Sequence, residues 1–248
     1  MRLGDEDVPN VLIYERFENT CTSPWGEVTK DKVDLYLRQV FNGVQAVHAA
    51  GYAHTEIKLE NVYMNHEDPK FALGNFEASQ PLDLEITEAD GYFYSRPFKN
   101  LPWYRSEDGK IHPVLINTKF DGDYVSMTAL DNWAFLLSLV EVCKQVQEDD
   151  MSCMNIIEGD SEAKVRGNPA TLSLRNVLHR FFGGIGCKYL DHKFEYTHSD
   201  GLGGEIAGKW NYGGVVCDSE DVLKSLLDLL SSDDAVQKVI HEVLPSSS

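Results

Sequence analysis

An apolar stripe between residues 29 and 50 constrains the fold of this chain most strongly. Apolar side chains recur there at steps of three and four residues, which predicts one amphipathic helix: Val33, Leu37, Val40, Phe41, Val44 and Val47. Thr29 or Asp31 can cap the start of this helix, and Gly51 fits its end. The helix therefore leads directly into a polar stretch, HTEIKLENV, which runs from His54 to Val62.

Short strands are predicted on either side of this helix and loop. Residues 11–15 (VLIYE), 62–64 and 70–73 are short apolar runs typical of strands. Residues 65–69 are expected to form the turn between the last two runs. Residues 80–128 contain four prolines and lack periodicity, so we expect a long and mostly irregular segment there.

The second half of the chain is predicted to be helical. Trp133, Leu136, Leu137 and Val140 share one face of a predicted helix, with Asp131 at its start, and residues 171–182 and 219–243 are further helix candidates. The glycine-rich stretch 201–214 lies between the last two. It lacks the lysine and hydroxyl that end a phosphate-binding loop, so a phosphate-binding role is not favoured.

Composition and charge limit the classes of function. A chain of 248 residues with 42% hydrophobic residues can build one large core or two small ones. The 40 acidic residues outnumber the 22 basic ones, which gives a net charge of -18. This charge argues against a nucleic-acid partner and mildly against anionic membranes, while it attracts basic protein surfaces.

The cysteines and the apolar runs indicate a cytoplasmic protein. Five cysteines are scattered without a C-x-x-C pair, which argues against a disulfide framework and a structural zinc site, so reduced thiols are expected: Cys21, Cys143, Cys153, Cys187 and Cys217. No run of eighteen apolar residues and no apolar signal core occur in the sequence, so we expect neither a membrane span nor secretion.

Four short motifs occur in the order found in one protein family. His54, Lys58 and Asn61 have the spacing of the sequence H-R-D-x-K-x-x-N, and residues 74–77 (GNFE) resemble G-D-F-G. Residues 101–107 (LPWYRSE) resemble W-Y-R-[AS]-P-E, and residues 131–134 (DNWA) resemble D-x-W-S. The chain therefore resembles the C-terminal lobe of a eukaryotic-type protein kinase, convincingly over residues 10–142.

The resemblance implies a mostly helical, kinase-like α+β fold with a few short strands. We expect a single domain over residues 1–248, with a remnant of the last N-lobe strand and hinge at 1–20 and the best-matched core at 29–142. Residues 143–248 would be a helical C-terminal part. By the same resemblance, Tyr14 is the gatekeeper, and Glu15, Arg16 and Phe17 form a vestigial nucleotide hinge.

The resemblance also implies that the chemical positions have changed. A kinase holds two Mg²⁺ ions and the ATP phosphates and orients a hydroxyl for attack. Asn75 stands where a metal-binding carboxylate is usual, and a neutral amide binds a hard cation without its charge. Glu56 stands where the aspartate base is usual and is one methylene longer, a displacement of about 1 Å that can cost about a hundredfold in rate.

The neighbouring positions are partly retained. Asn61 matches the second metal ligand, and Lys58 matches the phosphate-contacting lysine. Thr55 replaces the arginine that pairs with a phosphorylated activation segment, so regulation through such a phosphate is not expected. Glu77 replaces the flexible glycine of the metal turn and adds a repulsive carboxylate there.

The scaffold residues of the family are kept. His54 and Phe76 match members of a hydrophobic stack, and Asp131 matches the residue that accepts amide hydrogens from the catalytic loop. Trp133 is expected in the core. Leu136 replaces a glycine that is usual in the central helix.

A catalytically inactive kinase-like domain is the function that these residues favour. Only about ten residues precede the hinge-like stretch, so we expect no glycine-rich loop or strand lysine, no bound ATP or Mg²⁺, and no other metal. A protein partner or larger assembly would cover the surface that an N-lobe normally covers. One alternative is a truncated or split active kinase with Glu56 as base and Asn75 and Asn61 as weak metal ligands. Another is a module that senses nucleotide without turnover.

Overall fold

The structure is a computed structural model that describes residues 16–23, 25, 29–65, 67–84, 101–114, 118–145, 169–190, 194–199, 205–210 and 214–244. The strand expected at residues 11–15, the gatekeeper position Tyr14 and the hinge residue Glu15 lie outside these residues.

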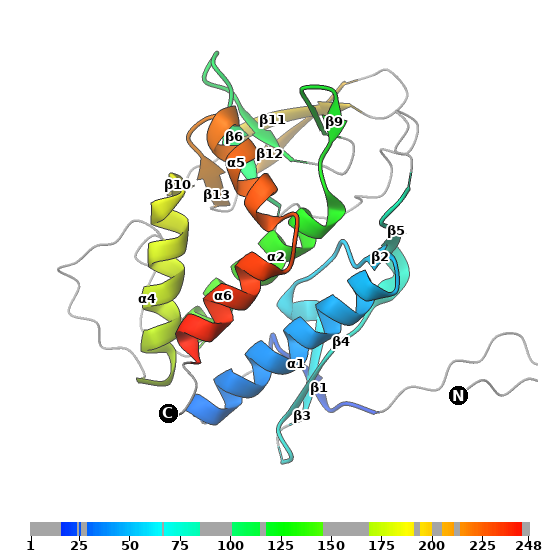
Figure 1. The fold of residues 1–248 in the computed structure, drawn as a ribbon, viewed down its shortest axis with the longest axis vertical. Helices are drawn as coiled ribbons and strands as arrows, with labels where there is room; N and C mark the ends of the chain where they lie inside the picture. The colour runs from blue at the N-terminus through cyan, green and yellow to red at the C-terminus, as the bar shows by residue number, and fades with distance from the viewer. Residues whose placement is uncertain are drawn as a thin grey trace, which may run out of the picture.

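Helices make up most of the regular structure, as the sequence predicts. The described part of the chain contains the helices α1 (Lys30–Ala49), α2 (Met127–Gln145), α4 (Pro169–Gly184), α5 (Glu220–Leu230) and α6 (Asp234–Val243), and the short 3-10 helices η1 (Leu59–Asn61) and η2 (Phe76–Ala78). α2 is central and packs against α1, α4 and α5 (Figure 1). The core therefore forms around α2, where Trp133, Phe135, Leu136 and Leu139 are fully buried.

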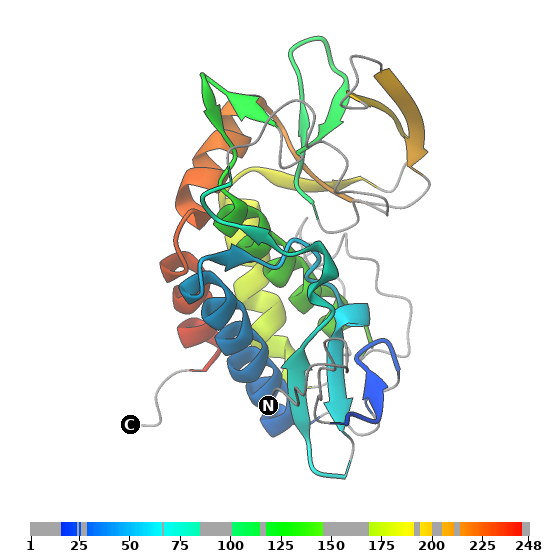
Figure 2. The same cartoon turned by 90° about the vertical axis from the view of Figure 1, so that its right-hand side faces the viewer.

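Two small sheets lie at opposite ends of the helical layer (Figure 2). The first joins β1 (Asn19–Thr20), β3 (Val62–Asn65) and β4 (Lys70–Leu73) in the order β1-β3-β4. The second has the order β10-β13-β6-β7 and joins β6 (Trp103–Arg105), β7 (Ile111–Pro113), β10 (Cys187–Leu190) and β13 (Gly214–Cys217). Three two-stranded pairs complete the strands: β2 (Tyr52–Ala53) with β5 (Gln80–Pro81), β8 (Lys119–Phe120) with β9 (Asp123–Tyr124), and β11 (Phe194–Ser199) with β12 (Glu205–Trp210).

The first helix forms as its sequence predicts. The Thr29 side chain accepts a hydrogen bond from the backbone N–H of Lys32 and caps the start of α1, whereas Asp31 lies within the first turn. Gly51 follows the helix with φ of 84°, a conformation that favours glycine. Five of the six predicted stripe residues are buried, and Val47 is partly buried.

Several local predictions need correction. The helix predicted at 219–243 is two helices, because the chain breaks at Ser231–Asp233, where the side-chain amide of Asn132 binds the carbonyls of Leu230 and Ser232. Asp131 lies one turn inside α2 and not at its start. These differences leave the order of elements unchanged.

More residues form strands than the local sequence pattern predicts. Within residues 101–107, which resemble the end of an activation segment, Trp103–Arg105 form β6, a strand paired in parallel with β13. The predicted glycine-rich loop contains β12, which pairs with β11 over six residues. The 80–128 segment contains β5 to β9 in its described part. The second sheet depends on pairing between residues that are more than a hundred positions apart. Such pairing cannot be predicted from the local sequence pattern.

Candidate functional site

The polar loop after β2 is held by a single buried carboxylate. Asp131 Oδ2 accepts the backbone N–H of His54 at 2.7 Å, and Oδ1 accepts the N–H of Thr55 at 2.8 Å. Thr55 has a positive φ of 65°, and its hydroxyl donates to the carbonyl of Ala78 at 2.8 Å. The strained backbone is therefore fixed from both sides, by α2 and by the segment after β4.

The His54 ring joins this loop to the turn that follows β4. Its Nε2 lies 2.9 Å from the carbonyl oxygen of Gly74 and donates to it, while Nδ1 accepts the backbone N–H of Glu56 at 3.3 Å. One ring nitrogen is thus a donor and the other an acceptor, which is the neutral form. Burial lowers the pKa of His54, in agreement with this pattern. The Phe76 ring packs edge-on against His54 at a centroid distance of 5.1 Å.

A second histidine, which the sequence analysis did not single out, completes the support. His48 Nε2 lies 3.0 Å from Asp131 Oδ2, and Nδ1 lies 3.0 Å from Asp233 Oδ1. Burial alone would lower the pKa of His48, but the hydrogen bonds and charges of the two carboxylates outweigh it and raise the pKa. The available signal was its place in the last turn of the predicted helix, one turn before the loop.

The four altered or retained chemical residues form one hydrogen-bonded cluster. Lys58 Nζ lies 3.2 Å from Glu56 Oε2, and the Asn61 amide donates to the Glu56 carbonyl at 2.8 Å. Asn75 adopts the left-handed conformation with φ of 62° and donates from its amide to Asn61 Oδ1 at 3.1 Å. The structure thus brings together Glu56, Lys58, Asn61 and Asn75, as the spacing of the motifs implies.

The cluster offers one carboxylate, one ammonium group and two amides. Within the described residues, no group of three or more histidine, cysteine, aspartate or glutamate side chains is placed to hold a metal ion. The Asn61 oxygen that would face a cation already accepts the Asn75 amide. Hard divalent cations prefer several anionic oxygens, so this donor set fits them poorly.

Gly74 is required by its surroundings. A Cβ at this position would lie 2.5 Å from Cε2 of the Tyr63 ring on β3. The backbone N–H of Gly74 also donates to the carbonyl of Asn61 at 2.9 Å. Glycine therefore lets the turn before Asn75 approach the β3 strand closely enough for the two asparagines to meet.

An apolar groove of about 500 Å³ lies beside the cluster. Phe76 and Tyr52 contribute aromatic rings to it and are 44% and 48% exposed. α1 supplies one wall, and β4 and the segment after it supply the other; the lining residues are Gly43, Ala46, Val47, Ala50, Tyr52, Leu73, Phe76 and Ser79. Phe76 is predicted within a hydrophobic stack; its ring packs edge-on against His54 and is 44% exposed.

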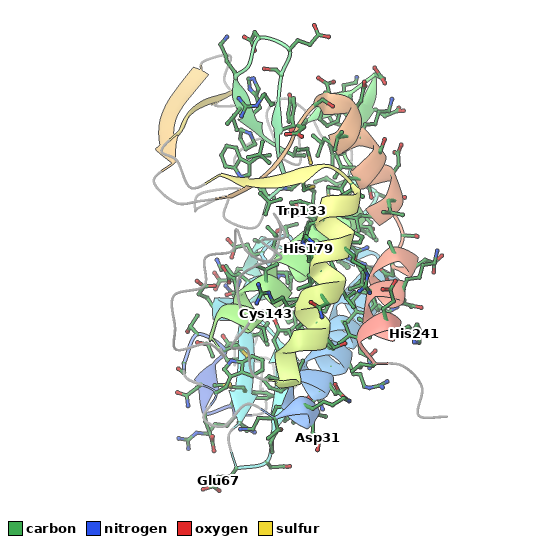
Figure 3. All side chains as sticks on the ribbon, turned by 90° about the vertical axis from the view of Figure 1, so that its left-hand side faces the viewer. Asp31, Glu67, Trp133, Cys143, His179 and His241 are labelled. Carbon is green, nitrogen blue, oxygen red and sulfur yellow. The ribbon has the colours of Figure 1, made fainter. Side chains whose placement is uncertain are left out.

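The remaining predicted residues lie apart from the cluster. Phe17, from the hinge-like stretch, packs against Tyr63 at a centroid distance of 6.1 Å, with Lys70 Nζ 5.9 Å from its ring, and Arg16 is exposed. Trp133 is buried in the interior between α2 and α4 and meets Phe182 edge-on at 5.4 Å (Figure 3). No helix in the described residues is both long enough and apolar enough to cross a membrane.

Comparison with known proteins supports a protein-kinase-like relationship. No family model matches the chain. Mouse mitogen-activated protein kinase 4 is 25% identical over 129 residues, which is 52% of this chain and 20% of that kinase. Bovine mitogen-activated protein kinase 13 is 29% identical over 82 residues, or 33% of the chain, and the Drosophila melanogaster mitogen-activated protein kinase p38b is 26% identical over 106 residues, or 43%. The alignments span only 20% to 23% of these relatives' own lengths, so the chain is similar to part of a protein kinase.

Proposed function

We propose that this chain is a kinase-like domain that does not transfer phosphate and that acts by binding another protein. The observation that supports this most directly is the hydrogen bond between the Asn75 amide and Asn61 Oδ1. By the kinase resemblance, these two side chains occupy the metal-binding positions. Here they bind one another and contribute no negative charge.

In a kinase, negative charge develops on the transferring phosphate. Mg²⁺ ions neutralise the charge that develops on it, and each preorganised electrostatic group of this kind contributes several kcal/mol. Loss of one anionic ligand is expected to cost roughly a thousandfold in rate or more. Glu56 adds a second cost, because its carboxylate is paired with Lys58 at 3.2 Å. The ammonium group that would contact a phosphate is thus already engaged.

The apolar groove supports the binding role. Two aromatic rings that are nearly half exposed in one groove are unusual for a surface that meets only water. Glu77, which follows Phe76 in the sequence, is exposed, and the whole chain carries a charge of -18. The expected partner is therefore a protein segment that places apolar side chains in the groove and basic side chains beside it.

The binding role is tested by a matched pair of variants. Tyr52→Ser combined with Phe76→Ser removes both exposed rings of the groove, whereas Leu229→Ser removes an equally exposed apolar side chain on α5. Crosslinking in native material should yield a protein that the parent chain and Leu229→Ser capture and the groove variant does not. Equal capture by all three would exclude the groove.

Nucleotide binding is tested separately. ATP at millimolar concentration, with and without Mg²⁺, should leave the thermal midpoint of the chain unchanged. A shift without turnover would favour the nucleotide-sensing alternative. The split-kinase alternative rests on Glu56, whose side chain is 25% exposed and so could reach a substrate hydroxyl.

A further inference from the structure

Two buried cysteines face each other within the second sheet. Cys187 on β10 and Cys217 on β13 are directly opposed in the antiparallel register. Their Sγ atoms are 3.7 Å apart, and the two residues are 4% and 0% exposed. Both are free thiols in this structure. Neither residue belongs to the kinase-like motifs.

The backbone at this position already fits a disulfide. Opposed residues in antiparallel strands have Cα atoms about 4.5 or 5.5 Å apart, and disulfides span Cα separations of about 4.4–6.8 Å. The strands therefore need not move for a bond to form. Small rotations of the two side chains bring the sulfur atoms from contact to bonding distance.

The position of β10 provides a route for an oxidant. β10 is the outermost strand in the order β10-β13-β6-β7, so within the described residues a single ladder of hydrogen bonds joins it to the sheet (Figure 2). End strands open locally at lower cost than central ones. Such an opening exposes Cys187, while Cys217 stays paired with Tyr104 on β6.

We propose that Cys187 and Cys217 are an oxidative modification site, at which a hydroperoxide such as hydrogen peroxide converts the two thiols to a disulfide that locks β10 to β13. The Cys187 sulfur attacks the peroxide, the O–O bond breaks, and a sulfenic acid and one water form. The Cys217 sulfur then attacks the sulfenic sulfur, the S–O bond breaks, and the disulfide and a second water form. Two electrons pass from the sulfurs to the peroxide.

The surroundings determine the rates of the two steps. The hydrogen bond with Cys217 and burial raise the pKa of Cys187, so the thiol is neutral near pH 7 and its first oxidation is slow. The second step is fast because the partner sulfur is already in contact. The site therefore forms a disulfide in preference to accumulating a sulfinic acid.

The bond would stabilise the sheet by closing a loop. The stretch between the two cysteines contains β11 and β12, and a cross-link over roughly 30 residues lowers the entropy of the unfolded chain. β13 in turn pairs with β6. Oxidation should therefore raise the thermal midpoint by several degrees and protect both neighbours of β13 from hydrogen exchange.

Mass spectrometry on the full chain tests the proposal. The reduced protein is treated with hydrogen peroxide, unfolded and alkylated, and then digested. The expected result is a Cys187–Cys217 linked peptide, two fewer alkylated thiols and full reversal by dithiothreitol. A bridge from either cysteine to Cys153, or sulfinic acid at either residue, would overturn the proposal, as would two thiols that remain reduced.

Matched variants separate the bridge from general oxidation. Cys187→Ser and Cys217→Ser should each abolish the peroxide-induced rise in thermal midpoint. Cys21→Ser, which changes a buried thiol beside Trp25, should keep it. If a serine variant does not fold, the presence or absence of the linked peptide in the parent protein tests the proposal. A peroxide-induced rise in thermal midpoint that persists in Cys217→Ser would contradict the proposal.

Discussion

His48 and Asp131 are joined by a hydrogen bond of 3.0 Å between Nε2 and Oδ2, although 83 residues separate them in the sequence. The same carboxylate accepts the backbone N–H groups of His54 and Thr55. α1, α2 and the polar loop therefore meet at one buried anion, whose three donors compensate the cost of its burial.

Asp131→Asn should destabilise the whole fold. An amide keeps one acceptor and turns two donors toward groups that also donate, so we expect a loss of about 2–5 kcal/mol in the free energy of unfolding, measured with urea. Glu67→Gln, at the exposed tip of the β3–β4 turn (Figure 3), is the control and should stay within about 0.5 kcal/mol. Equal stability of the two variants would remove Asp131 from its supporting role.

Stability should depend on pH through the two histidines in opposite directions. The pKa of His48 is raised in the folded state, so its contribution is fully present below about pH 6.5 and is lost as the pH rises through the folded pKa. The pKa of His54 is lowered, so its contribution is present above about pH 6.5 and is lost as the pH falls through the folded pKa.

Unfolding curves between pH 5 and pH 9 check both signs. His48→Gln should flatten the decline in stability above pH 6.5, and His54→Gln should flatten the decline below it. The opposite assignment, or two variants with the same profile as the parent protein, would contradict the hydrogen-bond pattern described for the two rings.

Gly74→Ala should lose stability through one identified contact. The added Cβ meets the Tyr63 ring at 2.5 Å, so we expect a cost of about 1–3 kcal/mol in urea unfolding. Tyr63→Ser removes the ring, and in that background the same change at Gly74 should cost much less. If the double-mutant cycle shows no coupling energy between positions 63 and 74, a contact other than the Tyr63 ring explains why glycine is required at position 74.

Asn75→Asp should restore part of a metal site. The carboxylate cannot donate to Asn61 Oδ1, so this oxygen becomes available, and the local charge becomes more negative. We expect a Mg²⁺-dependent increase in ATP affinity of about tenfold or more by calorimetry. Asn75→Ala frees the same oxygen without adding charge and should not show this increase; an equal gain in both variants would refute the electrostatic explanation.

The sequence predicts those parts of the fold that depend on local hydrophobic pattern or on the spacing of motifs. α1 was recognised because its stripe, its cap at Thr29 and its end at Gly51 all lie within one segment. The hairpin at residues 62–73 has a short turn and strands of the expected length. The contact between Asp131 and His54 is also predicted, because the kinase resemblance implies it. The local sequence around either residue does not indicate this contact.

Long-range pairing cannot be predicted from local pattern, whereas the break between α5 and α6 can be predicted in part. Trp103 pairs with Val216, and neither neighbourhood indicates the other. The break between α5 and α6 was partly visible, because consecutive serines and aspartates at 231–234 favour a new helix start. The role of His48 is not visible in the sequence because its partners, Asp131 and Asp233, lie 83 and 185 residues away.

Phosphotransfer by the purified chain is the most direct test of an inactive kinase-like domain. The chain is incubated with γ-labelled ATP, Mg²⁺ and peptide substrates that carry serine, threonine and tyrosine, and label in the peptides and in the chain itself is counted. We predict no incorporation above that of a sample without protein. Incorporation that disappears in Glu56→Gln would contradict it.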